Sequence, residues 1–393
     1  MRVLFINGVF PVLSQTFVLD HIKGFLESES NVEVLARKKS GFQFEDSIPE
    51  CDDNMLYIKP VNTKLFYRCI KGYIKRPLKS TRLVSLRLQK KIHAQTLIAY
   101  LQLQDEPDVM ITHFGNNYAI STQLKRYALP NAVNVIIFHG HDVTSYIEKN
   151  GWNNYRKVEK YIDYALCVNN HFADLLKKNT NIKDVRCLYL GTNLPEIKRK
   201  SHRQKVPQLL FVGRLVEKKG LIYLILACKV LRSKGVSFKL HIIGDGPLRT
   251  RLQNEVIQAE LTDYVVFYGA QQHNFILDMM SKCDIFVLPS VVAENKDSEG
   301  LPVVIMEAMN AGMLVISTYH SGIPELVQDG INGFLVREGD FVNLAKVIEK
   351  AFNLKVTTKE ALTNQAKKDV EAQHSKLNQV QELITLVESG EKQ

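Results

Sequence analysis

The sequence lacks the marks of three common protein classes. It has no run of about 18 predominantly apolar residues, so it predicts no membrane-spanning helix. Its six cysteines form no CxxC pair and mostly lie in or beside apolar runs, which predicts reduced, buried thiols rather than disulfides or a zinc site. The first strand pattern, INGVFP, lacks the GxGxxG turn of a dinucleotide-dependent oxidoreductase. These absences favour a protein of the reducing cytoplasm.

Acidic residues are missing from residues 54–104, where lysines and arginines alternate with aliphatic and aromatic residues. The whole chain has a formal net charge of +10. A basic, amphipathic stretch is typical of a surface that meets anionic lipid headgroups, so the segment predicts peripheral association with the inner face of the cell membrane. A nucleic-acid face and a merely solvated face are the alternatives, and the many apolar side chains argue against nucleic acid.

The first residues, MRVLFINGVFPVL, resemble a signal peptide only in that a basic residue is followed by apolar ones. Asn7, Gly8 and Pro11 interrupt the apolar run, and no clear small-residue cleavage site follows. We therefore predict a first strand that ends in a glycine turn, in a cytoplasmic protein.

Two similar halves follow from the length and the hydrophobic pattern. A chain of 393 residues suggests about two domains. Short apolar runs recur in the first half at RVLFING, NVEVLA, DVMITHFG, NVIIFHGHD and YALCVNN. In the second half they recur at QLLFVGR, KLHIIGDG, VVFYGA, DIFVLPS and MLVIST. Because helical segments follow them, these runs predict parallel strands buried on both faces. The fold class is therefore α/β, with two Rossmann-like doubly wound domains facing across a cleft.

The domain boundaries come from composition. We predict an N-terminal domain over residues 1–195, a polar, basic linker over residues 196–206 and a C-terminal domain over residues 207–374. The last helical pattern, in residues 375–393, follows a polar segment and is predicted to pack back on the first domain.

Candidate functional residues gather where the predicted strands end, which is where open α/β sheets bind ligands. These positions hold Gly8, His113, His139, Asn169, Gly213, Arg214, Gly244 and Glu299. Two such edges facing each other would enclose a small-molecule site between the domains.

The stretch SEGLPVVIMEAM places Glu299 and Glu307 on either side of a Gly-Leu-Pro turn. Pro302 suits the first turn of a helix, so Glu299 should lie just outside that helix and Glu307 inside it. The N–H groups at the helix start would come from Gly300, Leu301 and Val303. Such groups favour an anion, and two nearby carboxylates would accept from hydroxyls, which suits a sugar nucleotide. An ordinary surface glutamate beside an amphipathic helix is the alternative.

Two cations, Arg214 and Lys219, follow the strand pattern QLLFV within VGRLVEKKG. They are suited to hold a diphosphate and to stabilise its charge as it leaves. No Asp-x-Asp motif ends any predicted strand, so we predict stabilisation by cations without a metal. Lys218 is the alternative to Lys219, and an exposed charge cluster is the structural alternative.

Gly8 and Gly244, the latter in GDGP, could each let the backbone approach a phosphate or simply close a tight turn. His139, in FHGHDV, is suited to donate to a sugar hydroxyl or a leaving oxygen, with a structural histidine as the alternative. HGHD also has metal-ligand spacing, but only His113 suggests itself as a further ligand, so we predict no metal site. Asp142 is predicted to cap the next helix.

Taken in order, VGRLVEKKG, IGDGP, CDIFVLPS, EGLPVVIMEAM and SGIPELVQDGINGFLV resemble the signature of retaining glycosyltransferase family four, whose fold is GT-B. These motifs span residues 213–336. FPVLSQTFV, ITHFG and FHGHDV are similar to the branch that builds bacterial exopolysaccharides, colanic-acid-type polymers and lipopolysaccharide.

The resemblance implies a role for each candidate. A UDP- or GDP-linked sugar would lie on the C-terminal domain, at the loops of Gly213 and Gly244. Arg214 and Lys219 would hold its diphosphate. Glu307 would accept from the ribose hydroxyls, Glu299 and the backbone after it would bind the transferred sugar, and His139 would touch that sugar. Gly8 matches the family's first loop, whose Gly-Gly form is missing here.

The resemblance also implies that the anomeric configuration is retained. No carboxylate in the motifs is an obvious covalent nucleophile, unlike in hydrolases with two catalytic carboxylates. We hypothesise front-face transfer to a glycan or lipid-linked acceptor in bacterial surface polysaccharide synthesis, with no cofactor beyond the sugar nucleotide. A sugar-nucleotide epimerase of the same fold and a non-catalytic basic membrane-binding module are the alternatives.

Overall fold

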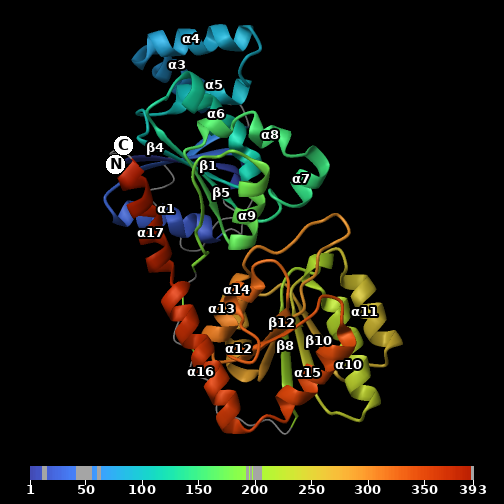
Figure 1. Cartoon of the computed structure of the whole chain (residues 1–393). Helices are drawn as coiled ribbons and strands as arrows, with labels where there is room; N and C mark the ends of the chain where they lie inside the picture. Colours follow the sequence, from blue (N-terminus) through green and yellow to red (C-terminus); the bar gives the residue numbers. More distant parts are fainter. Residues whose placement is uncertain are drawn as a thin grey trace. The chain divides into compact units, whose positions relative to one another are not determined.

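The structure is a computed structural model that describes residues 1–10, 16–40, 55–59, 63–191, 194, 197 and 206–390 (Figure 1). The chain divides into two units, one formed by Met1–Leu188 with Leu377–Gln393 and the other by Tyr189–Lys376. Most of the predicted linker, 196–206, lies outside the described residues. The predicted domain boundaries therefore stay predictions.

The first unit is built on a parallel sheet with seven strands among the described residues, in the order β3-β2-β1-β4-β5-β6-β7. The strands are β1 (Arg2–Phe10), β2 (Asn31–Lys39), β3 (Met55–Lys59), β4 (Val109–His113), β5 (Val133–Phe138), β6 (Tyr164–Cys167) and β7 (Val185–Cys187). The five strands predicted in this half are present. The sequence patterns did not predict β3 and β7, which are short and form the two edges of the sheet.

Helices cover both faces of this sheet (Figure 1). They are α1 (Thr16–Glu27), α3 (Thr63–Lys75), α4 (Pro77–Leu88), α5 (Ala94–Gln102), α6 (Tyr118–Tyr127), α7 (Ser145–Asn150), α8 (Asn153–Arg156), α9 (Asn170–Asn179) and α17 (Lys376–Gly390). Val3 and Phe5 of β1 join one core with α1 and α17, whereas Leu4 and Ile6 join a second core with α5 and α6. This alternation explains why β1 reads as a continuous apolar run.

The last helix, α17, is part of the core of the first unit. Its apolar face enters the core that contains α1 and the sheet, through Val380, Leu383, Ile384 and Val387. Gly24 allows α1 to approach closely, since a Cβ there would lie 2.0 Å from a methyl carbon of Val380. The end of the chain thus completes the domain in which the chain begins.

The second unit repeats the architecture, with six described strands in the order β10-β9-β8-β11-β12-β13, all parallel. The strands are β8 (Gln208–Val212), β9 (Lys239–Ile243), β10 (Val265–Gly269), β11 (Ile285–Leu288), β12 (Leu314–Thr318) and β13 (Phe334–Val336). The helices are α10 (Leu221–Ser233), α11 (Arg249–Gln258), α12 (His273–Lys282), α13 (Val303–Asn310), α14 (Ile323–Leu326), α15 (Phe341–Phe352) and α16 (Val356–Gln373). The prediction of two doubly wound parallel-sheet domains is confirmed.

Two further observations bear on the sequence-based expectations. No helix among the described residues is long and apolar enough to cross a membrane. The cysteines that the structure describes are free thiols, namely Cys69, Cys167, Cys187, Cys228 and Cys283. Cys51 lies outside the described residues.

We predict that Leu383→Ala, in α17, destabilises the first unit by about 2–5 kcal/mol, because it opens a cavity in a fully buried site. The chain's single tryptophan, Trp152, lies in this unit, so its fluorescence during urea unfolding reports on the unit alone. Leu377→Ala is the matched control, since Leu377 lies in the same helix and is 74% exposed. Equal midpoints for both variants would contradict the placement of α17.

Candidate functional site

In the second unit, candidate residues follow the carboxyl ends of four neighbouring strands. Gly213 and Arg214 follow β8, and Gly244 follows β9. Glu299 lies in the loop between β11 and α13, and His320 follows β12. This is the edge at which open α/β sheets bind ligands.

A buried ion pair joins two of these loops. Nζ of Lys219 lies 2.7 Å from Oε2 of Glu299, and Nζ of Lys218 lies 3.5 Å from Oε1 of the same carboxylate. The side chains of Glu299 and Lys219 are only 8% and 14% exposed. Lys218 also binds Asp297 and the carbonyl of Ser298. The structure therefore brings both candidate lysines to Glu299, with Lys219 the closer.

The charge on Glu299 depends on these lysines. Burial by itself would raise the pKa of Glu299, but the ammonium groups of Lys219 and Lys218 outweigh it and hold the pKa at about 2. Oε1 is buried and accepts no hydrogen bond within the described part of the chain, and Nζ of Lys218 lies 3.5 Å from it. The carboxylate is thus ionised at neutral pH and keeps one oxygen able to accept from a hydroxyl.

His320 fixes the backbone of this loop, a role that sequence reasoning missed. The N–H of Glu299 donates to Nε2 of His320 at 3.0 Å, so the proton of this neutral ring is on Nδ1. Nδ1 then donates to Oε1 of Glu338 at 2.6 Å. The sequence feature that could have identified His320 is its position two residues after the predicted strand MLVIST.

Glycines allow the loops to approach one another. Gly220 has φ +65°, and a Cβ there would lie 1.8 Å from the carbonyl oxygen of Pro289. Gly244 has φ +134°, and a Cβ there would lie 1.9 Å from the carbonyl oxygen of Gly213. The close packing of the backbone at the ends of β8 and β9 therefore explains why position 244 is a glycine. Gly213 lies under the aliphatic stem of Lys219, whose Cδ would be 3.5 Å from an added Cβ.

Arg214 is exposed, and in the described part of the chain it forms no ion pair. Its guanidinium is therefore available to an anion at the end of β8.

The helix after Glu299 begins at Val303, directly after Pro302, while Leu301 is buried and Gly300 is partly buried. Glu307 lies inside this helix, and its Oε1 is 3.0 Å from Nε2 of His273, at the start of α12. The hydrogen bond to Glu307 raises the pKa of His273. Sequence reasoning did not single out His273.

In the first unit, His139 follows β5, and its ring stacks on Phe17 and contacts the tilted ring of Phe114, with ring centroids 4.6 and 4.5 Å away. Its Nε2 lies 3.1 Å from Nδ1 of His113, the last residue of β4. Because these nitrogens face each other, they do not converge on a point where a cation would sit. Among the described residues, no group of three or more His, Cys, Asp or Glu is arranged to hold a metal ion.

Two sequence-based assignments near His139 are changed by the structure. The prediction that Asp142 caps the next helix is wrong, because its carboxylate accepts from the N–H groups of Gly115, His139 and Gly140. It thereby ties the loops after β4 and β5 together. Asn169, a candidate ligand-binding residue in the sequence, caps α9 by accepting from the N–H of Phe172, so it has a structural role.

Gly8 does not close a turn. The predicted glycine turn is wrong because β1 continues to Phe10, still paired with β2. A Cβ at Gly8 would lie 3.1 Å from Oδ1 of Asn117 and 3.3 Å from a guanidinium nitrogen of Arg37. Arg37 donates to that amide oxygen at 2.9 Å, so Gly8 leaves room for this hydrogen bond.

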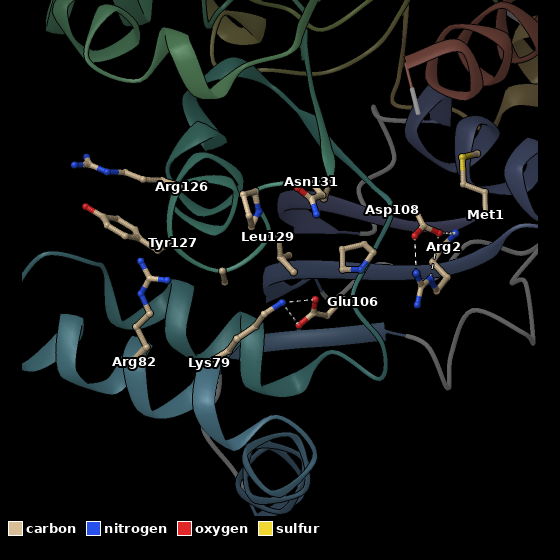
Figure 2. A pocket seen from close by; sticks show the side chains of 14 residues that line it. Met1, Arg2, Lys79, Arg82, Glu106, Asp108, Arg126, Tyr127, Leu129 and Asn131 are labelled. Atoms are coloured by element: carbon tan, nitrogen blue, oxygen red, sulfur yellow. Dashed lines mark hydrogen bonds and ion pairs between the residues drawn. The ribbon is translucent and has the colours of Figure 1, made fainter. Parts of the chain in front are cut away.

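A cavity of about 980 Å³ lies elsewhere in the first unit (Figure 2). Arg2, at the start of β1, pairs with Asp108, which directly precedes β4, at 2.6 Å. Lys79 and Glu106, which also line this cavity, form a second ion pair. The cavity is therefore at the amino ends of the strands, and it contains none of the predicted site residues.

Comparison with known proteins identifies similar chains. Residues 194–369 match the family described as glycosyl transferases group 1. The chain is 31% identical to the putative colanic acid biosynthesis glycosyltransferase WcaL of Salmonella typhimurium, over 94% of this chain and 95% of that protein. It is 28% identical to the amylovoran biosynthesis glycosyltransferase AmsK of Erwinia amylovora, over 88% and 90% of the two chains.

Solved structures show the same fold at low identity. Sucrose-phosphate synthase of Thermosynechococcus elongatus is 17% identical with a TM-score of 0.76, over 99% of this chain and 98% of that one. HepE of Anabaena, solved with UDP and glucose, is 16% identical with a TM-score of 0.72, over 99% and 100% of the chains. These neighbours confirm the predicted GT-B fold.

The Glu299 pair predicts a specific acid sensitivity. Because the folded pKa of about 2 lies below the ordinary value of 4.5, the pair stabilises the fold fully above about pH 4.5 and loses this effect as the pH falls through about 2. Below pH 4.5, wild type should lose stability relative to Glu299→Gln by about 1.4 kcal/mol per pH unit in urea unfolding. Exposed Glu294→Gln is the control. A pH-independent difference would show that the fold does not lower the pKa of Glu299, and a difference of opposite sign would show that the carboxyl is protonated in the fold.

Proposed function

The chain belongs to the glycosyl transferases group 1 family, and from that premise we propose that it is a retaining enzyme whose donor is a nucleoside diphosphate sugar. We propose a glycan or lipid-linked glycan as acceptor, in the synthesis of a bacterial surface polysaccharide. The names of WcaL and AmsK, which refer to colanic acid and amylovoran biosynthesis, support this acceptor class.

The observation that carries the donor proposal is the buried carboxylate of Glu299 between two lysines. Lys219 is held at 2.7 Å from Oε2, so its ammonium is oriented in the loop after β8. Arg214, exposed and without an acidic partner in the described chain, precedes it in the same loop. A diphosphate placed here would meet two cations, and Oε1 of Glu299, which accepts no hydrogen bond among the described residues, would accept from a hydroxyl of the transferred sugar.

Transfer requires that negative charge on the leaving diphosphate be stabilised. Lys219 and Arg214 supply that stabilisation in our proposal, without bond formation to the protein. As the bond between the anomeric carbon and the diphosphate oxygen breaks, the acceptor oxygen bonds to the same face of that carbon and its proton passes to the leaving diphosphate oxygen. The configuration is retained because bond formation and bond breaking take place on one face. Glu307 accepts from the ribose hydroxyls through Oε2, since Oε1 is engaged by His273.

The alternatives are less well supported. An epimerase would need a general base and no acceptor, and the relatives above are named as glycosyltransferases. A non-catalytic module would have no need of a buried, ionised carboxylate at the ligand edge of the sheet, which carries the cost of desolvation.

We predict that one nucleoside diphosphate stabilises the protein in a thermal-shift panel, by about 2.7 kcal/mol at about 100 times its dissociation constant. Uridine and guanosine diphosphates are the first to test. Glu307→Ala should weaken this stabilisation, because it removes the proposed acceptor for the ribose. Glu299→Ala should keep the stabilisation and lower turnover with the sugar nucleotide about 100-fold.

Exposed Glu294→Ala is the control for both variants. If no nucleoside diphosphate stabilises the protein, the proposed donor class is wrong. If Glu299→Ala and Glu307→Ala change donor affinity and turnover alike, the division of roles between them is wrong.

We further propose that α3 and α4 meet the anionic membrane surface on the inner face of the cell membrane. These helices form the outer layer of the first unit, beyond α5 (Figure 1). Their exposed apolar side chains include Phe66, Tyr67, Ile70, Ile74 and Leu78, of which Ile74 is 72% exposed. Such exposure is costly in water and favourable at a headgroup boundary.

The charge of this surface is smaller than the sequence suggests. Lys75 pairs with Asp105 and Lys79 with Glu106, two acids that directly follow the acid-free segment. Arg76 turns inward and donates to the carbonyl of Leu103. Exposed cations without an ion pair in the described chain remain at Lys71, Arg82, Arg87, Lys90 and Lys91. Apolar contact therefore contributes alongside electrostatic attraction.

We predict that Ile74→Ser reduces binding to vesicles of anionic phospholipid about tenfold, because one apolar side chain no longer inserts. The matched control is Ile257→Ser, which changes an isoleucine that is 63% exposed on α11. Equal retention of both variants, or salt-sensitive binding to nucleic acid in place of vesicles, would contradict the membrane proposal.

A further inference from the structure

Three histidines of the first unit form a continuous chain of ring nitrogens. Nδ1 of His21, in α1, lies 3.4 Å from Nε2 of His113, whose Nδ1 lies 3.1 Å from Nε2 of His139. At the other end, the amide nitrogen of Gln379, in α17, lies 2.6 Å from Nε2 of His21. The chain runs from the C-terminal helix to the carboxyl edge of the sheet.

The three rings are neutral at physiological pH. Burial lowers the pKa of His21 to about 4 and that of His139 to about 3, and it lowers the pKa of His113 well below its ordinary value. A neutral imidazole has one N–H donor and one acceptor nitrogen. The proton position on one ring therefore dictates the position on the next, and only two arrangements connect all three.

Gln379 selects between these arrangements. With its amide nitrogen toward His21, it donates to Nε2, so His21 carries its proton on Nδ1 and donates to His113. His113 then donates from Nδ1 to Nε2 of His139, which leaves the proton of His139 on Nδ1. The opposite orientation of the amide would reverse every bond and make Nδ1 of His139 an acceptor.

Nδ1 of His139 is the open end of the chain. It is shielded from solvent and has no hydrogen-bond partner among the residues that the structure describes. A buried donor without an acceptor is unfavourable, and an oxygen of a bound ligand would satisfy it. Phe17 and Phe114 pack against the ring of His139, so its direction is set before any ligand arrives.

We propose that Gln379, His21 and His113 are positioning residues that keep the proton of His139 on Nδ1, where it is donated to an oxygen of the transferred sugar. The sugar as the acceptor of this bond rests on the proposed function, whereas the order of the protons does not. The C-terminal helix then acts on the chemistry of the first domain as well as on its packing.

The proton order is measurable without activity. In protein labelled with ¹⁵N-histidine, the chemical shifts separate protonated from unprotonated ring nitrogens, and single substitutions assign the three rings among the 11 histidines of the chain. We expect His139 to be protonated on Nδ1 and unprotonated on Nε2. Protonation on Nε2 would overturn the proposed polarity.

The positioning role is tested with Gln379→Met, which removes the amide at similar size. The His139 shifts should then average between the two tautomers, because nothing selects one. Gln381→Met changes an exposed glutamine of the same helix and should leave them unchanged. His21→Phe interrupts the chain at a second point and should have the same effect as Gln379→Met. If the ¹⁵N chemical shifts of His139 are unchanged in both Gln379→Met and His21→Phe, the proposal is wrong.

Turnover separates this proposal from the proposed function. His139→Ala should lower kcat about 100-fold, and Gln379→Met should lower it by part of that factor with KM for the sugar nucleotide unchanged. If the proton order is as expected but His139→Ala transfers sugar at the wild-type rate, the sugar contact is wrong. A raised KM in Gln379→Met with unchanged kcat would refute a role in presenting the proton.

Discussion

The ionised carboxylate of Glu299 is the constraint on which the second unit's ligand edge depends. A buried charge is tolerated only while its partners stay close, and here both partners, Lys218 and Lys219, come from the loop after β8. That loop can lie where it does because Gly220 adopts a positive φ against the carbonyl of Pro289. His320 holds the opposite side through the backbone of Glu299. One charge thus ties together the loops that follow β8, β11 and β12.

The first unit positions its candidate side chain, His139, without an ion pair. Its edge carries neutral, buried histidines whose order is set by hydrogen bonds, and Asp142 binds the neighbouring loops through three backbone N–H groups. Cationic groups are suited to bind an anionic diphosphate. A neutral N–H donor is suited to bind the oxygen of an uncharged hydroxyl. The two domains share an architecture but present different chemistry at their carboxyl edges.

The fold was largely predictable because parallel strands buried on both faces read as continuous apolar runs. The three strands that the patterns did not predict, β3, β7 and β13, are edge strands, where fewer neighbours impose that pattern. The predicted turn at Gly8 was wrong because glycine is common in turns, whereas here it lies inside a strand and leaves room for the side chains of Asn117 and Arg37. Asp142 misled it because a capping residue and a loop-binding residue look alike without tertiary contacts.

By itself the sequence determined the α/β class, the two sheets, the placing of His139 after a strand, of Lys219 and Glu299 before helices, and of Glu307 inside a helix. Those features follow from local periodicity and spacing. Only the tertiary structure decided that both lysines share one carboxylate, and that His21 and Gln379, 358 positions apart, belong to one hydrogen-bonded chain. The physical reason is that hydrogen bonds and ion pairs form only between atoms a few ångströms apart. Local periodicity predicts helices and strands, but it does not indicate which residues far apart in the chain come into contact.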